Sequence, residues 1–284
     1  MMYDDSLCYL NGNYVPLASA SIPVLDRGFI FGDGIYEVVP AYGKRPFRLE
    51  QHLDRLQRSL AETRIENPHP RGQWRAIIER LIGSSPANDL VVYMQVTRGV
   101  AKRDFAFPAH VAPTVFAMAS PLTRPSAAQR DGGLRAISVP DLRWLRCDIK
   151  SVSLLGAVMA RQQAAERGLD EVVQHRDGRL TEGSASNVWM VKAGRVLAPP
   201  RDHLILEGIR YGFIQELCEQ AAIAFEVRVI SMEEVRAADE LMLSAATREV
   251  LPIVELDGRP IGDGRPGPVY RQLRRGYDAA IAAL

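Results

Sequence analysis

Lysine is rare in this chain of 284 residues, and one of its lysines stands in an apolar stretch. Only four of the 35 basic side chains are lysines, and the others are arginines. Lys44 and Lys192 fall in predicted turns, and Lys102 falls in a long polar loop. Lys150 differs, because the strand and helix patterns on both sides of it predict neighbours in a core.

The chemistry open to such a lysine is that of an amine nucleophile. Burial disfavours the charged form of an amine, and the neutral form can attack a carbonyl group. A lysine in this setting therefore suits Schiff-base chemistry. Two other interpretations stay open on the residues alone: a lysine that extends into solvent from a strand end, or one that pairs with Asp148.

Two further motifs carry less information about function. Gly262–Gly267 has the glycine spacing of a dinucleotide-binding loop, but it contains a proline and is followed by too little chain. We expect a turn there. Ser184 and Ser186 could suggest a hydrolase nucleophile, but the GxSxG pattern of such enzymes is absent.

A metal site is not predicted. Neither a CxxC nor an HExxH spacing occurs, and the five histidines are scattered. Asp26, Asp33 and Glu37 form a small acidic group near a predicted turn. We expect this group on a solvated surface.

Composition excludes several classes of protein. The 35 basic and 34 acidic residues nearly balance, whereas a nucleic-acid partner would require an excess of positive charge. No apolar run is long enough to span a bilayer, so no membrane partner is predicted. Cys8, Cys147 and Cys218 are odd in number and far apart, which predicts no disulfide framework. Together with an acidic start unlike a signal peptide, these features predict a cytoplasmic protein.

The elements that must position the candidate residues follow from hydrophobic periodicity and turn signals. The predicted strands are 7–10, 22–25, 35–42, 90–97, 111–119, 134–139, 172–175, 188–191, 225–230 and 241–244, and the predicted helices are 50–63, 74–82, 154–167, 209–222 and 269–284. No regular βαβ rhythm appears, which favours an α+β fold in two domains. We place an N-terminal domain at 1–119, a linker at 120–133 and a C-terminal domain with Lys150 at 134–284.

Four blocks of the sequence, in this order, resemble those of the fold type IV pyridoxal-phosphate aminotransferases. They are 26–39 (DRGFIFGDGIYEVV), 52–56 (HLDRL), 143–150 (RWLRCDIK) and 181–187 (TEGSASN). The similarity runs from near residue 3 to the final helix. The block that ends in Lys150 is similar to that of the D-amino-acid aminotransferases within this group.

The resemblance implies roles for residues by position. Lys150 resembles the lysine that holds pyridoxal 5'-phosphate as a Schiff base and then moves the substrate proton. Glu182 matches the acid that faces the pyridine nitrogen and keeps it protonated. Arg55 matches a ligand of the cofactor phosphate. The other cofactor-binding positions that the resemblance implies are Ile209, Arg210, Ala246 and Thr247.

The substrate side of the resemblance is less complete. Tyr36 and Arg103 match residues that receive the substrate carboxylate, and phenol plus guanidinium is a chemically sensible carboxylate trap. Phe105 stands where the D-amino-acid branch has a histidine, so one hydrogen bond to the carboxylate is missing. Three more positions depart from the family pattern: Arg210 replaces a threonine, Ala246 a hydroxyl residue and Ala185 a serine.

The activity implied by the resemblance is transamination by a ping-pong mechanism. The enzyme would move the amino group of a D-amino acid to a 2-oxo acid, either 2-oxoglutarate or pyruvate, and would be a homodimer. The alternatives are a transaminase for L-branched-chain amino acids or (R)-amines, an aminodeoxychorismate lyase of the same fold, and a non-catalytic binding protein that keeps the fold.

Overall fold

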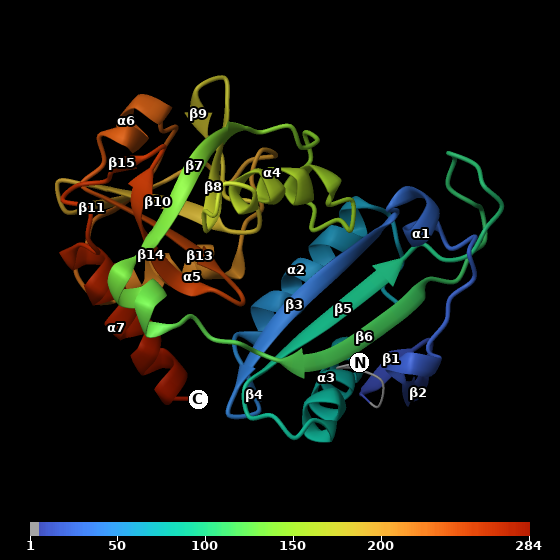
Figure 1. The fold of residues 1–284 in the computed structure, drawn as a ribbon. Coiled ribbons are helices and arrows are strands. Elements are labelled where there is room, and N and C mark those ends of the chain that lie inside the picture. Colours follow the sequence, from blue (N-terminus) through green and yellow to red (C-terminus); the bar gives the residue numbers. More distant parts are fainter. Residues whose placement is uncertain (1–5) are drawn as a thin grey trace. The chain divides into compact units, whose positions relative to one another are not determined.

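Residues 6–284 are described by a computed structural model, in which the chain forms two separate sheets (Figure 1). The sheets belong to two units. The first unit comprises the chain up to Thr123 together with Ile149–Ser153, and the second comprises Arg124–Asp148 and Leu154–Leu284. Helices accompany a mixed sheet without βαβ regularity, which confirms the predicted α+β fold.

The first unit is a six-stranded antiparallel sheet in the order β2-β1-β6-β5-β3-β4. Helices α2 and α3 pack on it, α2 against β3 and α3 against β1, β5 and β6. Its elements are β1 (Leu7–Leu10), β2 (Asn13–Pro16), the 3-10 turn η1 (Leu17–Ser19), α1 (Arg27–Phe31), β3 (Gly34–Tyr42), β4 (Arg45–Pro46), α2 (Leu49–Glu62), α3 (Arg71–Ser84), β5 (Leu90–Thr97) and β6 (Thr114–Pro121).

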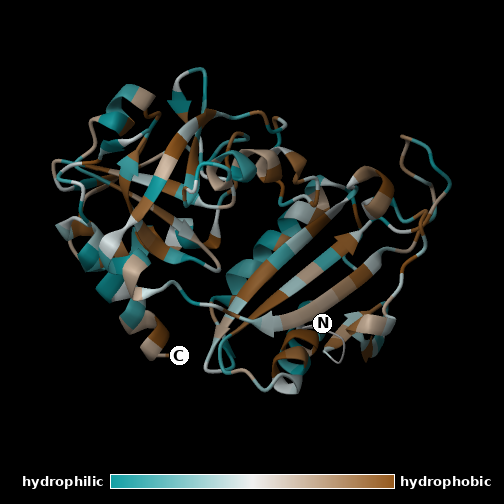
Figure 2. Cartoon of the chain, viewed as in Figure 1, coloured by the Kyte–Doolittle hydropathy of each residue, from teal (hydrophilic) through white to brown (hydrophobic). Residues whose placement is uncertain are grey.

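Helix α2 shows why this unit holds polar residues in its interior. Leu53, Leu56 and Leu60 recur at helical spacing and are buried against the sheet, as predicted. His52 and Arg55 lie on the same side of the helix and are buried too. Figure 2 shows the hydrophobic residues that β3 and β5 contribute to this unit.

The second unit is a nine-stranded mixed sheet in the order β12-β11-β10-β13-β14-β7-β8-β9, with β15 paired to β14. Its elements are the π-helical turn η2 (Ala128–Gly132), β7 (Leu134–Pro140), α4 (Leu155–Ala165), β8 (Glu171–Arg176), β9 (Arg179–Leu180), β10 (Asn187–Lys192), β11 (Arg195–Ala198), α5 (Ile209–Gln220), β12 (Phe225–Val227), α6 (Met232–Arg236), β13 (Glu240–Ala245), β14 (Glu249–Leu256), β15 (Arg259–Pro260) and α7 (Pro268–Ala282). The predicted turn at Gly262–Gly267 is confirmed, with Gly262 and Gly264 at positive φ.

The division into units differs from the predicted domains at the segment that carries the lysine. Ile149–Ser153 groups with the first unit, although the chain on both sides of it belongs to the second. Backbone pairing is the reason, because the Tyr36 N–H donates to the Lys150 carbonyl at 3.0 Å. Lys150 therefore packs with the first unit.

Some predicted elements are wrong or shorter. Residues 22–25 form an exposed turn instead of a strand, and the predicted strand 225–230 ends at Val227. The prediction omitted β14, the strand that joins β13 to β7. Apolar residues around Lys150 that were expected in a core are exposed: Trp144, Leu145, Leu154, Leu155, Val158 and Met159.

Candidate active site

Lys150 is held by a short backbone pairing with β3. Ser151 forms an antiparallel bridge with Ile35, and the Lys150 N–H donates to Ser59 Oγ at 3.3 Å. Side chains alternate between the faces of paired strands, so Lys150 and Tyr36 point to the same face. Lys150 is half-buried, and its Nζ lies 4.0 Å from the centre of the Tyr36 ring. The candidate nucleophile thus has a defined position above an aromatic ring.

Two residues on this face were not predicted as part of the site. Tyr93 stacks on Tyr36 with 5.8 Å between ring centres, and the Tyr93 hydroxyl donates to Gln95 Oε1 at 2.7 Å. Burial, with Tyr36 close by, raises the pKa of Tyr93 to about 12. The signal that could have found them is strand register, because Gln95 lies opposite Tyr36 in the β3–β5 pair.

Glu37 lies on the opposite face of β3 and is fully buried, which makes the prediction of a solvated acidic surface wrong. Arg55 donates to its two oxygens at 2.7 and 2.9 Å, and His52 Nδ1 lies 2.8 Å from Oε2. Burial alone would raise the pKa of Glu37, but Arg55 and the hydrogen bonds of His52 and Arg55 lower it far below its usual range. Asp26 is buried as well, as the N-cap of α1. Asp33 accepts from two arginines.

Arg103 and Phe105 lie on the exposed loop between β5 and β6. The Arg103 guanidinium is 5.4 Å from the Phe31 ring and 5.6 Å from the Phe105 ring, and the two rings are 5.5 Å apart. Phe105 is 79% exposed. This part of the predicted substrate site is therefore an aromatic and cationic cluster at the surface of the first unit.

Glu182 is a buried carboxylate of the second unit with its donors arranged around it. Arg143 Nη1 donates to Oε1, and the Leu206 N–H and Asn187 Nδ2 each donate to Oε2 at 3.1 Å. A carboxylate offers about four acceptor positions, and these donors use three. Room is left for one further donor.

Burial raises the pKa of Glu182 above its ordinary value, while Arg143 acts in the opposite direction. Arg143 is shared with Asp141, to which it donates from Nε at 2.9 Å and from Nη2 at 2.7 Å. Burial alone would lower the pKa of Arg143, but the two carboxylates raise it. The prediction did not give Arg143 a role, although it opens the block that ends in Lys150.

The start of α5 lies against the residues that hold Glu182. Gly208 is the N-cap, and a Cβ there would lie 2.2 Å from Asn187 Oδ1, so only glycine allows this approach. No side chain caps this helix, and the first-turn amides, at Ile209 and Arg210, are of the kind that binds anions.

Arg210, Ala246 and Thr247 come together in the second unit. The buried Arg210 side chain donates to the Tyr277 hydroxyl at 2.9 Å and to the Ala246 carbonyl at 3.5 Å. Ala246 and Thr247 lie in the half-buried turn between β13 and β14. The guanidinium that replaces the expected threonine is therefore directed toward this turn.

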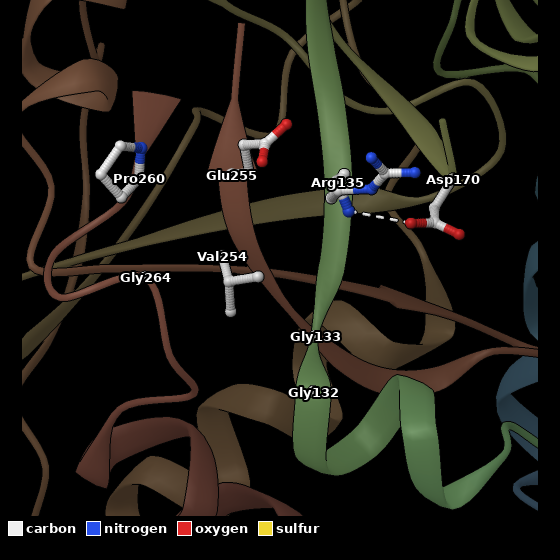
Figure 3. A pocket seen from close by; sticks show the side chains of 8 residues that line it. All are labelled: Gly132, Gly133, Arg135, Asp170, Val254, Glu255, Pro260 and Gly264. Carbon is white, nitrogen blue, oxygen red and sulfur yellow. Dashed lines mark hydrogen bonds between the residues drawn. The ribbon is translucent and has the colours of Figure 1, made fainter. Parts of the chain in front are cut away.

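The hollow in Figure 3 is not part of these clusters. It has a volume of about 320 Å³ and lies in the second unit, where Arg135, Asp170 and Glu255 are its charged lining residues. None of the predicted site residues lines it. Within residues 6–284, no group of three or more His, Cys, Asp or Glu side chains is placed to hold a metal ion. No helix in this range has both the length and the apolar character needed to cross a membrane.

Comparison with known proteins identifies the class of enzyme. Residues 34–256 match the model of the class IV amino-transferase family. The chain is 36% identical over 274 residues to the D-alanine aminotransferase of Staphylococcus haemolyticus, covering 96% of this chain and 97% of the relative. In structure it is similar to the branched-chain amino acid aminotransferase of Escherichia coli, with a TM-score of 0.92 at 23% identity over 97% of this chain and 94% of the other.

A second solved structure has the same fold. The branched-chain amino acid aminotransferase of Thermobaculum terrenum, in its pyridoxal-phosphate form, matches with a TM-score of 0.87 at 24% identity, covering 99% of this chain and 95% of the other. These likenesses identify an aminotransferase fold. The chain belongs to the class IV amino-transferase family, whose members use pyridoxal 5'-phosphate, so the predicted enzyme class and cofactor are confirmed.

The donor sets of this structure fit that cofactor. Glu182 has an acceptor position left for a protonated ring nitrogen. The uncapped start of α5 suits a phosphate group. Lys150 supplies an amine. These are the three kinds of group that the cofactor requires.

Proposed function

We propose that this enzyme moves the amino group of D-amino acids to 2-oxo acids, 2-oxoglutarate or pyruvate, by a ping-pong mechanism. The observation that carries the proposal is the pairing of Lys150 with β3, which directs an amine over the Tyr36 ring. Relatives that match nearly the whole chain are D-alanine aminotransferases, which supports a D-amino acid as donor. The branched-chain enzymes are similar at 22–25% identity and support the fold.

Lys150 is the proposed catalytic residue. Bound pyridoxal 5'-phosphate supplies an aldehyde for imine formation and a ring that accepts electrons from the substrate Cα. Once the substrate amine has displaced it from the imine, the free Lys150 Nζ would take up the substrate Cα proton and give it back, acting as base and acid in turn. Backbone pairing to β3 supports this role, because it limits how far Nζ can move.

Glu182 is the proposed partner of the ring nitrogen. Burial raises its pKa, while Arg143 acts in the opposite direction. A carboxylate at this position would keep the ring nitrogen of a bound cofactor protonated. Arg143 stabilises the carboxylate by donating to Oε1, and Asn187 orients it by donating to Oε2.

The phosphate is proposed to bind to backbone amides and cationic groups. Ile209 and Arg210 supply first-turn amides of α5, and Ala246 and Thr247 supply the turn beside the Arg210 side chain. Arg55 supplies a guanidinium, which also donates to Glu37 at 2.7 and 2.9 Å.

The substrate carboxylate is proposed to bind Tyr36 and Arg103, with Phe105 beside them. The exposed state of Arg103 and Phe105 in the isolated chain supports a homodimer in which these loops are covered. Further exposed apolar residues of the first unit, Val24, Leu25, Phe29, Val100 and Phe107, support the same assembly. Sedimentation of the purified protein tests it, and a monomer at micromolar concentration would contradict it.

The proposed compartment is the cytoplasm, and the substrates are small amino acids and 2-oxo acids. Cys8, Cys147 and Cys218 are free and buried. Free thiols are usual in a reducing compartment.

Chemical trapping tests the role of Lys150. Borohydride reduction of the holoenzyme, followed by digestion and mass spectrometry, is expected to find the cofactor on the peptide that carries residue 150. Lys150→Ala is expected to abolish transamination while the far-UV circular dichroism stays unchanged. A label on another lysine would disprove the assignment.

A half-reaction tests the donor. The holoenzyme is mixed with D-alanine, L-leucine or (R)-1-phenylethylamine, and loss of the cofactor absorbance is followed. We expect D-alanine to react fastest. Reaction with L-leucine alone would establish the branched-chain alternative, and release of pyruvate from aminodeoxychorismate without an acceptor would establish the lyase.

A further inference from the structure

We propose that Glu171 is a positioning residue that couples the loop carrying Glu182 to the turn carrying Ala246 and Thr247. The proposal rests on the proposed function, in which these two segments hold opposite ends of the cofactor. Glu171 does not itself contact the Glu182 side chain or the turn at Ala246 and Thr247. It acts through Ser184 and Ser186 on one side and through Arg248 on the other, as the following contacts indicate.

Glu171 opens β8 and is almost completely buried, with 2% of its side chain exposed. Its Oε1 accepts from the Ser184 hydroxyl and from the Ser184 N–H at 3.2 Å. Its Oε2 accepts from the Ser186 hydroxyl at 3.3 Å and from Arg248 Nη1 at 2.7 Å. One carboxylate therefore joins two segments that are more than 60 residues apart in the chain.

The Glu182 side of this connection is tightly packed. The Gly183 N–H donates to the Ser186 carbonyl at 2.6 Å, and a Cβ on Gly183 would lie 2.2 Å from Ser186 Oγ. The main chain of Glu182 is bound too, because its carbonyl accepts from the Gln174 N–H of β8 at 2.8 Å. A shift of the Glu171 carboxylate would therefore move the serines and the backbone that orients Glu182.

The other side of the connection is equally constrained. Arg248 directly follows Thr247, and the next residue, Glu249, is buried with φ at +57°. Glu249 is held in this left-handed conformation by ion pairs with Arg124, Arg130 and Arg274 at 2.7–2.9 Å. With its main chain anchored there, Arg248 transmits the position of Glu171 to the turn at 246–247.

The physical basis is an ion pair in which the Glu171 carboxylate is buried and the Arg248 guanidinium is half-buried. Removing Arg248 leaves Glu171 charged in a place that water reaches poorly, and removing either partner takes away the fixed point that the two segments share. Because the cofactor would bind both segments, loss of their relative order is expected to weaken binding even in a correctly folded chain. A purely structural pair would change stability alone.

The test is a double-mutant cycle on the apoprotein. The dissociation constant of pyridoxal 5'-phosphate is measured for wild type, E171Q, R248M and the double variant by titrating protein fluorescence. We expect each single variant to raise the dissociation constant about tenfold, and the double variant to be no worse than E171Q, because both changes break one connection. Additive losses, or unchanged affinity in the folded variants, would overturn the coupling.

Two controls keep the result specific. R248K retains the positive charge and is expected to recover most of the affinity for the cofactor. R195M removes an exposed ion pair with Glu226 in the same unit and is expected to leave the dissociation constant unchanged. The melting temperature of each apoprotein separates folding from binding, and if E171Q fails to fold, R248M and R248K decide. A wild-type apoprotein that does not bind the cofactor would overturn the proposed function as well, whereas intact binding in every variant overturns only the coupling.

Discussion

Each unit contains a buried glutamate that is hydrogen-bonded to an arginine, and the pKa values of the two glutamates shift in opposite directions. Glu37 lies inside the first unit with Arg55 on both of its oxygens and His52 beside it, and its pKa is lowered despite burial. Glu182 lies inside the second unit, where Arg143 contacts one oxygen only, and burial raises its pKa. The residue types are nearly the same, and the direction of the shift differs.

The difference is in how the cation is shared. Arg55 gives two charge-assisted bonds to a single carboxylate, the strong bidentate arrangement. Arg143 gives two guanidinium hydrogen bonds to Asp141 and one to Glu182, and the negative charge of Asp141 also disfavours ionisation of Glu182. Glu37 is therefore a structural anion, whereas we propose that Glu182 acts on the ring nitrogen of the cofactor. A perturbed pKa indicates function only when the arrangement of its partners is known.

The largest effect is expected for Glu182→Gln on catalysis. An amide cannot keep the ring nitrogen protonated, so kcat should fall by about 100- to 1000-fold, as when one preorganised electrostatic group is removed. Steady-state rates with D-alanine and 2-oxoglutarate measure this. An E182Q enzyme with near-normal kcat would show that Glu182 has no part in the mechanism. The same rates are measured for E37Q, in which the other buried glutamate is changed, as a comparison.

Glu37→Gln should have the larger effect on stability. The change leaves Arg55 buried without its anion, which is expected to cost about 3–5 kcal/mol of unfolding free energy. E182Q resembles the protonated form of its carboxyl and should cost less than about 1 kcal/mol. Urea denaturation of the two apoproteins measures both values. Equal losses would contradict the contrast between the two sites.

The two sites should also differ in the pH dependence of stability. The stabilisation from Glu37 is present above the unfolded pKa of about 4.3 and is lost as pH falls below it, because the folded pKa is lower. The contribution of Glu182 is present below that pKa and is lost as pH rises through its higher folded value. Relative to wild type, E37Q should flatten the loss of stability in acid, and E182Q should not. Urea midpoints between pH 3.5 and 7 report this.

The smallest effect is expected for Asp141→Asn. Removing this negative charge leaves Arg143 with a single carboxylate, so the pKa of Glu182 should fall toward the behaviour of Glu37. Carbon-13 NMR of labelled glutamate, with E182Q to assign the signal, measures the change. An unchanged titration would show that burial alone controls Glu182.

Much of the secondary structure was predictable because its signals are local. The predicted helix 50–63 and the predicted strands 7–10, 35–42 and 90–97 correspond to α2, β1, β3 and β5. Residues 22–25 were misassigned because β-branched residues can also line an exposed turn, where no neighbouring strand pairs with them. The strand β14 was missed although its pairing with β13 and β7 is central to the second sheet.

The predictions for the candidate site rest on local signals of the same kind. Motif blocks single out Lys150, Glu182 and Arg55, because their chemistry is carried by residue type and neighbours. Arg143 and Tyr93 were not assigned roles, because their importance comes from contacts with residues distant in the chain. The prediction of an exposed Glu37 was wrong because His52 and Arg55, which lie on helix α2, bind its carboxylate inside the unit.

The order of residues alone determined the enzyme class and the periodicity of the helices and strands, and it predicted the amine that would form an imine. Tertiary structure decided which unit holds Lys150, in which direction the pKa values of Glu37 and Glu182 shift, and which loops share the Glu171 carboxylate. The physical reason is that side-chain chemistry and hydrophobic period are local properties. Burial, charge sharing and strand register depend on segments that only folding brings together.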